Sequence, residues 1–298
     1  MVIDSDIPAV PAQLRVPVAD DVELALEQWG EEGAPLLFLH ATGFSRSVWR
    51  PACRLFSSQH PGYRLLALDM RGHGDSSKPP APYDWTLFVS DLEALCDRLG
   101  LRNLVICGHS VGGATAVSFA ARRPELVSGL VLVEAALRPR DAEGRAGLKS
   151  DLIGRTERRR SHWDTRPQAV DYLRARSPYD SWDEATFIAW TETGLRETAE
   201  GVVLSCPPWV EASVFAEASD SRAWDELGRL QCPVWIGRGT GLRGLPSTTA
   251  PEAVTSVPLA FEQVAPGDGH FVPLERVAWT VGLLEEAVGY LERANPTS

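Results

Sequence analysis

The sequence predicts an α/β fold, in which a mostly parallel sheet carries helices on both faces and is interrupted by a helical insert. Short apolar runs alternate with helix-like segments four times over the first 136 residues. The alternation stops for residues 137–228, which contain helix-like segments rich in tryptophan, and it resumes at Cys232. Short connections between alternating strands and helices favour a parallel sheet.

The strands are predicted from two kinds of pattern. Two strand-like runs flank residues 19–21, and alternation over 22–27 indicates an antiparallel strand with one solvent-facing side. The remaining strand candidates are nearly continuous apolar runs, as expected for strands buried on both faces. These runs cover residues 35–39, 64–68, 104–107, 129–133, 232–237 and 259–264.

Helices are expected between these strands, where apolar residues recur with a helical period. Before the insert they are predicted at 48–56, 85–99 and 114–122, and after it at 247–255 and 274–293.

The composition is that of an acidic globular protein. Of 298 residues, 44% are apolar and 23% are charged, and the formal net charge is −11. A strongly negative surface disfavours nucleic acid and anionic membranes as partners. One short basic cluster, at residues 155–160, contains Glu157 and is expected to be a solvated helix face.

The N-terminal residues and the cysteines favour a cytoplasmic protein. The first residues lack the basic and apolar regions of a secretory signal, and no apolar run is long enough to cross a membrane. The five cysteines are scattered, odd in number and without metal-ligand spacing, which favours reduced thiols.

The pattern Gly108-x-Ser110-x-Gly112 lies between an apolar run and a helix-like segment. This context is the one in which a nucleophile elbow projects a serine from the end of a parallel sheet. Small residues are needed because the turn is strained and the neighbouring strand and helix are close. The helix N-terminus offers backbone N–H groups to a developing oxyanion.

A serine hydroxyl needs a base, and His270 is the best candidate among six histidines. It lies in a glycine-flanked loop after the last strand, beside the expected position of the elbow. His40 and His73 are expected to have structural roles, and strand alternation turns His109 away from Ser110. His60 and His162 have no supporting context, although His162 lies in the insert and could face a pocket.

Four motifs in order resemble those of α/β-hydrolases: residues 40–43, 69–76, 108–113 and 269–271. The resemblance covers nearly the whole chain. It implies an eight-stranded α/β-hydrolase core formed by residues 1–136 and 229–298, with an α-helical cap formed by 137–228. It implies a Ser-His-acid triad and no cofactor. A serine at the elbow argues against haloalkane dehalogenases and epoxide hydrolases of this fold, which have aspartate there.

The acid of the triad departs from the usual family pattern. In most α/β-hydrolases it follows the seventh strand, but residues 238–244 contain no acid. The family's other placement is at the end of the sixth strand, as in some dehalogenases, luciferases and lactonases, and Glu134 stands there. A charge ending a buried strand needs a partner. Glu134 is therefore assigned, with Asp268 as the alternative.

The resemblance also implies an oxyanion hole made by the backbone N–H groups of Val111 and Thr42. Thr42 follows His40-Ala41, where the family usually has His-Gly. The turn around Asp69 and Arg71 is expected to be structural.

The expected function is hydrolysis of a carboxylic ester or lactone of an apolar or aromatic small molecule by Ser110, His270 and Glu134. Alternatives on the same triad are a carbon–carbon bond hydrolase, a lyase or a cofactor-free oxygenase, and a ligand receptor is the non-enzyme alternative. A homodimer is also possible. Candidate substrate-binding residues are His109, Trp163, Trp182, Trp190 and Trp209.

Overall fold

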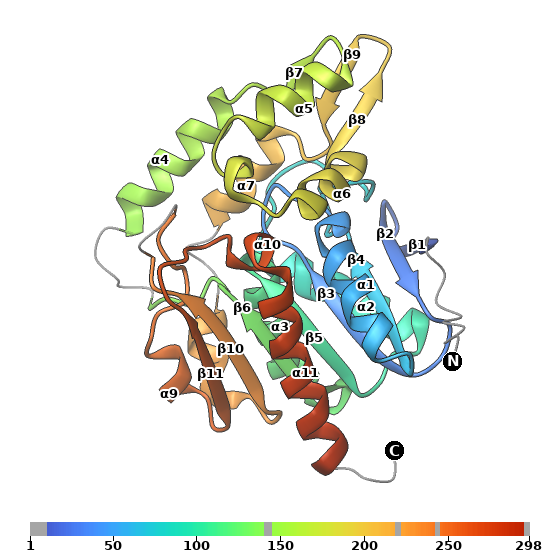
Figure 1. Cartoon of the computed structure of the whole chain (residues 1–298), viewed down its shortest axis with the longest axis vertical. Coiled ribbons are helices and arrows are strands. Elements are labelled where there is room, and N and C mark those ends of the chain that lie inside the picture. The colour runs from blue at the N-terminus through green and yellow to red at the C-terminus, as the bar shows by residue number, and fades with distance from the viewer. Residues whose placement is uncertain (1–10, 140–144, 218–221, 242–244, 295–298) are drawn as a thin grey trace.

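The protein is described from a computed structural model that covers residues 11–139, 145–217, 222–241 and 245–294. Its centre is an eight-stranded sheet with the order β1-β2-β4-β3-β5-β6-β10-β11 (Figure 1). β2 is antiparallel to its neighbours β1 and β4, whereas the pairs from β4 to β11 are parallel. The strands are β1 Ala12–Ala19, β2 Val22–Trp29, β3 Ala34–Leu39, β4 Tyr63–Leu68, β5 Leu104–His109, β6 Val127–Val133, β10 Val234–Gly239 and β11 Ala260–Ala265.

Helices cover both faces of this sheet. On one face α2 (Trp85–Leu99) packs against α3 (Val111–Arg122), and their apolar side chains form one core cluster with β4, β5 and β6. On the other face α1 (Arg50–Gln59) packs against α11 (Val277–Ala294) and belongs to a second cluster. The predicted parallel sheet with helices on both faces, an α/β-hydrolase-type sheet of eight strands, is confirmed.

Most predicted elements are present, with three differences near their ends. The helix predicted at 48–56 is preceded by the 3-10 helix η1 (Arg46–Trp49), and the closing helix is divided into α10 (Val272–Glu275) and α11. The helix predicted at 247–255 is wrong except for α9 (Ala253–Ser256). Residues 247–249 instead use their hydroxyls and amides to bond the backbone and side chain that follow β6, which competes with a helix.

The insert is residues 137–228, and its described residues 145–217 lie beyond one end of the sheet (Figure 1). The prediction of a helical insert missed a three-stranded antiparallel sheet with the order β7-β9-β8. These strands have two to four residues, too few for a period to be visible in sequence. The insert contains α4 Arg145–Arg158, β7 His162–Trp163, α5 Arg166–Arg174, η3 Tyr179–Ser181, α6 Glu184–Gly194, β8 Leu195–Thr198, β9 Gly201–Leu204, α7 Pro208–Glu217, α8 Ala223–Glu226 and η5 Leu227–Arg229.

The lengths of the helices and the state of the cysteines are two further features of the fold. None of the helices in the ranges given above is long and apolar enough to cross a membrane. The five cysteines are buried free thiols.

Candidate active site

Ser110 occupies the turn between β5 and α3, in a backbone conformation that side chains rarely adopt. Its φ is 55° and its ψ is −120°. Neighbouring backbone holds this turn, because the Ser110 N–H donates to the Glu134 carbonyl oxygen at 3.2 Å and the Ala136 N–H donates to the Ser110 carbonyl oxygen at 2.9 Å. A strained residue of this kind costs about 1–3 kcal/mol and persists only where the surroundings fix it.

The flanking glycines permit the close packing that the elbow requires. A Cβ on Gly108 would lie 2.6 Å from the Gly113 Cα, and a Cβ on Gly112 would lie 2.5 Å from the Leu39 carbonyl oxygen. Both distances are too short for real carbon atoms, and both neighbours are backbone. The turn is therefore limited to glycine at these positions.

His270 and Glu134 both follow the carboxyl ends of parallel strands and come together at one edge of the sheet. Glu134 directly follows β6 with a φ of 48°, and His270 lies in the loop between β11 and α10. The His270 Nδ1 lies 3.5 Å from the Glu134 Oε2, and both side chains are buried. The contact brings the two predicted residues into one site.

The Glu134 carboxylate accepts three further hydrogen bonds. Its Oε1 accepts from the Gly239 N–H at 2.6 Å and from the Ser247 hydroxyl at 2.8 Å, and its Oε2 accepts from the Thr248 N–H at 2.9 Å. These donors stabilise a buried negative charge. Sequence reasoning missed all three, because no local pattern connects residues 239–248 with the end of β6.

Thr248 also fixes the proton position on His270. The Thr248 hydroxyl donates to the Glu134 carbonyl oxygen at 2.7 Å, so its oxygen is free to accept from the His270 Nδ1, which is 3.1 Å away. With Thr248 and Glu134 as acceptors, the proton of the neutral ring belongs on Nδ1. The Nε2 atom then carries the basic lone pair.

The alternative acid, Asp268, is directed elsewhere. Its Oδ2 accepts from the Arg276 Nη1 at 2.6 Å, at the surface of the protein. Of the two acids that the sequence offered, Glu134 is the one that contacts His270.

The backbone N–H groups of Thr42 and Val111 remain available at the elbow. Val111 is the first residue of α3, where an amide has no partner within the helix. Among the hydrogen bonds of the described residues, neither amide donates to a protein acceptor. Thr42 and Val111 are both buried.

His40 fixes the loop that contains Thr42. The Met70 N–H donates to the His40 Nε2 at 3.1 Å, and the His40 Nδ1 donates to the Ala41 carbonyl oxygen at 2.8 Å. Burial lowers the pKa of His40 to about 4, so the ring is neutral and both nitrogens are satisfied. This is the structural role expected for His40.

His109, a predicted substrate-binding residue, lies behind His270 instead. It is fully buried, its Nε2 donates to the His270 carbonyl oxygen at 2.8 Å, and the two rings are 4.9 Å apart. Burial lowers the pKa of His109 well below its usual range, which keeps it neutral beside a second imidazole. The alternation of β5 directs its side chain into the core, and its assignment to substrate binding stays a prediction.

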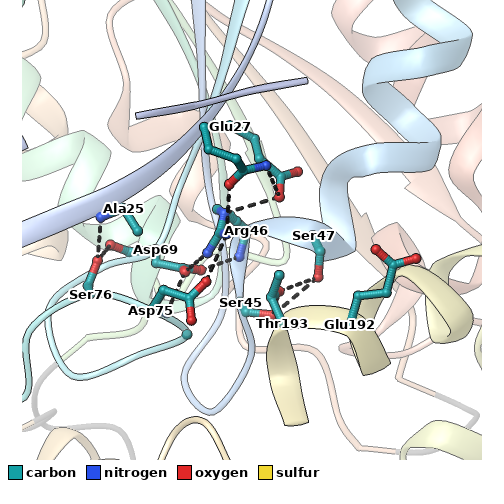
Figure 2. Close-up of polar contacts among 12 residues, drawn as sticks. Ala25, Glu27, Ser45, Arg46, Ser47, Asp69, Asp75, Ser76, Glu192 and Thr193 are labelled. Atoms are coloured by element: carbon teal, nitrogen blue, oxygen red, sulfur yellow. Dashed lines mark hydrogen bonds and ion pairs between the residues drawn. The ribbon is translucent and has the colours of Figure 1, made fainter. Parts of the chain in front are cut away.

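A buried charge network holds the end of the Thr42 loop (Figure 2). The Arg46 Nε donates to the Glu27 Oε1 at 3.1 Å, its Nη2 donates to the Asp75 Oδ2 at 2.9 Å, and its Nη1 donates to Asp69. The Arg46 N–H also donates to the Asp69 Oδ1 at 2.6 Å. Burial would raise the pKa of Glu27, but Arg50 and Arg46 lower it below its usual range.

The same loop contacts the insert through hydroxyl groups (Figure 2). The Thr193 hydroxyl of α6 lies 2.8 Å from the Ser45 hydroxyl and 2.6 Å from the Ser47 hydroxyl. All three residues are buried. The insert is thereby hydrogen-bonded to the segment that carries the Thr42 amide.

Two of the four candidate tryptophans belong to an aromatic cluster that includes Phe271, the neighbour of His270 in sequence. Trp182 packs edge-on against Phe44 with ring centroids 4.7 Å apart, and Trp190 packs against Trp182. Phe44 in turn packs against Phe271, the neighbour of His270 in sequence, with ring centroids 6.0 Å apart. This aromatic cluster connects the insert with the loop that carries His270.

The other two tryptophans are placed away from that cluster. Trp163 is fully buried within the insert, beside Tyr172 and Arg160, and Trp209 is 47% exposed on α7. No ring contact of the described residues joins either of them to Phe44, Phe271 or His270. Their assignment to substrate binding stays a prediction, and burial and direction depend on packing that composition does not show.

The part of the chain that the structure describes contains no cluster of three or more His, Cys, Asp or Glu side chains able to hold a metal ion.

Comparison with known proteins agrees with the fold. A family model described as the α/β hydrolase fold matches residues 34–160. A non-heme chloroperoxidase of Streptomyces lividans is 36% identical over 122 residues, which are 40% of this chain and 44% of that protein. The match thus spans less than half of this relative's length. Non-heme chloroperoxidase CPO-A1 of Kitasatospora aureofaciens is 26% identical over 89% of this chain and 96% of its own length.

A solved structure extends the likeness to the insert. The crystal structure of E-2-(acetamidomethylene)succinate hydrolase matches with a TM-score of 0.81 at 21% identity, over 94% of this chain and 99% of that one. These likenesses show that the chain has the α/β-hydrolase fold. α/β-hydrolases carry many chemistries on one scaffold, so the activity has to be argued from the site residues.

Proposed function

We propose that the protein is a serine hydrolase that cleaves a carboxylic ester or lactone of an apolar or aromatic small molecule through an acyl-enzyme intermediate. One observation carries this proposal. The His270 Nδ1 lies 3.1 Å from the Thr248 hydroxyl and 3.5 Å from the Glu134 carboxylate, which leaves Nε2 as the base. Ser110 is the nucleophile on the adjoining elbow.

The reaction follows the general course of acyl transfer. The Ser110 Oγ attacks the carbonyl carbon while the His270 Nε2 takes its proton, and Glu134 stabilises the imidazolium that forms. The N–H groups of Thr42 and Val111 hold the oxyanion. His270 then protonates the leaving oxygen, and a water molecule activated by His270 releases the acyl group from Ser110.

The substrate class rests on the aromatic cluster above the elbow. Trp182, Trp190, Phe44 and Phe271 present apolar rings beside the histidine site. Such rings favour an apolar or aromatic ligand. We also propose that residues 137–228 act as a cap over the site.

The direct test is covalent labelling with a fluorophosphonate probe. Wild-type protein should be labelled and Ser110→Ala should not, while Ser90→Ala, which changes an exposed serine of α2, should be labelled normally. The same proteins should be assayed on 4-nitrophenyl esters, aryl lactones and diketones. Loss of turnover by several orders of magnitude in Ser110→Ala is expected. Unchanged labelling of that variant would contradict the proposal.

The panel separates the chemistries that this triad can perform. Ester or lactone cleavage that follows the Ser110 variants supports the proposal. Turnover confined to diketones would contradict ester specificity and assign carbon–carbon bond hydrolysis instead.

A further inference from the structure

Arg159 and Glu211 form a largely buried ion pair within the insert, beside the Thr42 loop. Arg159 directly follows α4 and Glu211 lies in α7, and the Arg159 Nη2 is 2.6 Å from the Glu211 Oε2. A Cβ on Gly43 would lie 2.9 Å from the Glu211 Oε1, so the carboxylate packs directly against the residue after Thr42. The pair therefore stands beside the oxyanion loop.

The position of Arg159 differs from the expectation for the basic cluster at 155–160. Arg155 fits that expectation, since it is exposed and pairs with Asp151 one helical turn away. Arg159 instead turns inward to Glu211. The reason is that α4 ends at Arg158, so the next residue is free of the helix surface.

The pair leaves hydrogen-bonding capacity unused. Within the described residues, the Arg159 Nε, the Arg159 Nη2 and the Glu211 Oε2 are buried atoms with no hydrogen-bond partner, although the last two are close enough to attract electrostatically. A buried polar atom without a partner costs about 1–3 kcal/mol, and more when it is charged. In the Arg46 network, by contrast, each of the three guanidinium nitrogens donates a hydrogen bond.

The surroundings of the pair are poorly hydrated. Burial raises the pKa of Glu211 above its usual range, and Arg159 opposes the rise. Tyr179 lies close enough to feel both charges, and burial raises its pKa to about 12. Tyr179 also stacks on Trp190 with ring centroids 4.6 Å apart, so the pair adjoins the aromatic cluster.

We propose that Arg159 and Glu211 form a subsite for a carboxamide group in the acyl part of the substrate. The inference rests on the proposed function. A carboxamide oxygen accepts from the Arg159 Nε, and the carboxamide NH₂ donates to the Glu211 Oε2. One neutral group thus satisfies both an unused donor and an adjacent unused acceptor. A carboxylate would satisfy Arg159 but face the Glu211 charge, and an alkyl group would leave all three atoms unpaired.

The position of the pair assigns the group to the acyl part. The leaving oxygen must face His270, which protonates it. The carbonyl oxygen faces Thr42 and Val111. Gly43 and Glu211 lie on the side of the site that carries the Thr42 amide. The acyl chain of the substrate, rather than its leaving group, therefore runs toward the Arg159–Glu211 pair.

The test uses 4-nitrophenyl esters whose acyl chains end in a carboxamide, a carboxylate or an isopropyl group of similar size. Each ester should be made with three and with four methylene groups, because chain length decides reach. For wild-type protein we expect kcat/KM for the better carboxamide ester to exceed that of the isopropyl ester by about 10–100-fold.

Two variants separate the subsite from a structural role. Glu211→Gln removes the charge and supplies an NH₂ donor, so it should reverse the preference and favour the carboxylate ester. Arg159→Met should abolish the preference among the three esters. Glu197→Gln, an exposed carboxylate of the insert paired with Arg166, is the matched control and should retain the wild-type ranking.

The readouts keep the outcomes distinct. Labelling of Ser110 by the fluorophosphonate probe reports folded, active protein in every variant, so the Glu211→Gln ranking decides the matter even if Arg159→Met fails to fold. Equal rates for the carboxamide and isopropyl esters in wild-type protein would overturn the subsite while leaving the serine hydrolase intact. An absence of both labelling and turnover in wild-type protein would overturn the proposed function and the subsite together.

Discussion

Replacing Glu134 with glutamine exchanges one carboxylate oxygen for an NH₂ group at the centre of the triad. If NH₂ takes the Oε2 position, it meets the Thr248 N–H and the His270 Nδ1–H, which are both donors. If it takes the Oε1 position, it meets the Gly239 N–H, which is 2.6 Å from the oxygen in wild-type protein. In either orientation the NH₂ group of the glutamine faces an N–H donor and cannot form a hydrogen bond with it.

The magnitude follows from these contacts. At least one charge-assisted hydrogen bond is lost, and such bonds contribute about 1.5–3 kcal/mol each to stability. The loss of negative charge beside His270 removes stabilisation of the imidazolium. Amide replacement of a triad acid lowers kcat by up to about 10⁴-fold. We expect Glu134→Gln to lower kcat by about 10²–10⁴-fold, with a smaller change in KM.

The assay compares kcat for a 4-nitrophenyl ester with stability from urea unfolding. Asp268→Asn is the matched control, because it makes the same chemical change in the neighbouring loop. Its ion pair with the half-exposed Arg276 contributes about 0–1 kcal/mol, and kcat should change less than about threefold. A larger loss of kcat in Asp268→Asn than in Glu134→Gln would refute the assignment of the acid.

Three further outcomes are expected. Arg46→Met leaves Asp69 buried without its cation and leaves Glu27 paired with Arg50 alone, so urea unfolding should show a loss of about 3–5 kcal/mol. Arg15→Met, which breaks an exposed pair, should cost less than about 1 kcal/mol, and equal losses would contradict the role of burial. Trp182→Ala should lower kcat/KM for aryl esters about 10-fold or more, while Trp209→Ala should change it less than about threefold, and the reverse order would show that the pocket lies elsewhere. Burial lowers the pKa of His40 to about 4, below the usual histidine pKa of about 6.5, so the unfolded chain takes up the proton first as pH falls. Stability should drop by about 3 kcal/mol between these two pH values, and NMR should show a neutral His40 ring at about pH 5. An NMR titration of His40 near pH 6.5 would contradict this last expectation.

Local patterns in the sequence were sufficient for the main frame of the protein. The run 104–107 followed by glycines predicts a strand and a tight turn because apolar side chains need burial and only glycine allows the close backbone approach found at Gly108 and Gly112. The absence of an acidic residue at 238–244 predicts that Glu134, at the end of the preceding strand, is the acid of the triad. The structure brings Glu134 and His270 together, as the order of the motifs suggested.

Other features depend on partners that are distant in the chain. Residues 247–249 have a helix-like pattern, yet their hydroxyls and amides bond Glu134 and Ala135, more than a hundred positions away, and the helix is lost. The sequence offered no reason to place Thr248 beside His270. A hydrogen bond depends on the distance between two groups in space, which a local period does not encode.

The tryptophans and the basic cluster also show the difference between residue composition, which the sequence gives, and side-chain direction, which depends on packing. Composition showed aromatic residues in the insert but not that Trp182 meets Phe44 while Trp209 faces solvent. The charge pattern at 155–160 showed a basic segment but not that Arg159 turns inward to Glu211. The sequence by itself determined which elements form and which residue types end them. Only tertiary packing decided which side chains face the site, because burial is a property of neighbours brought together by folding.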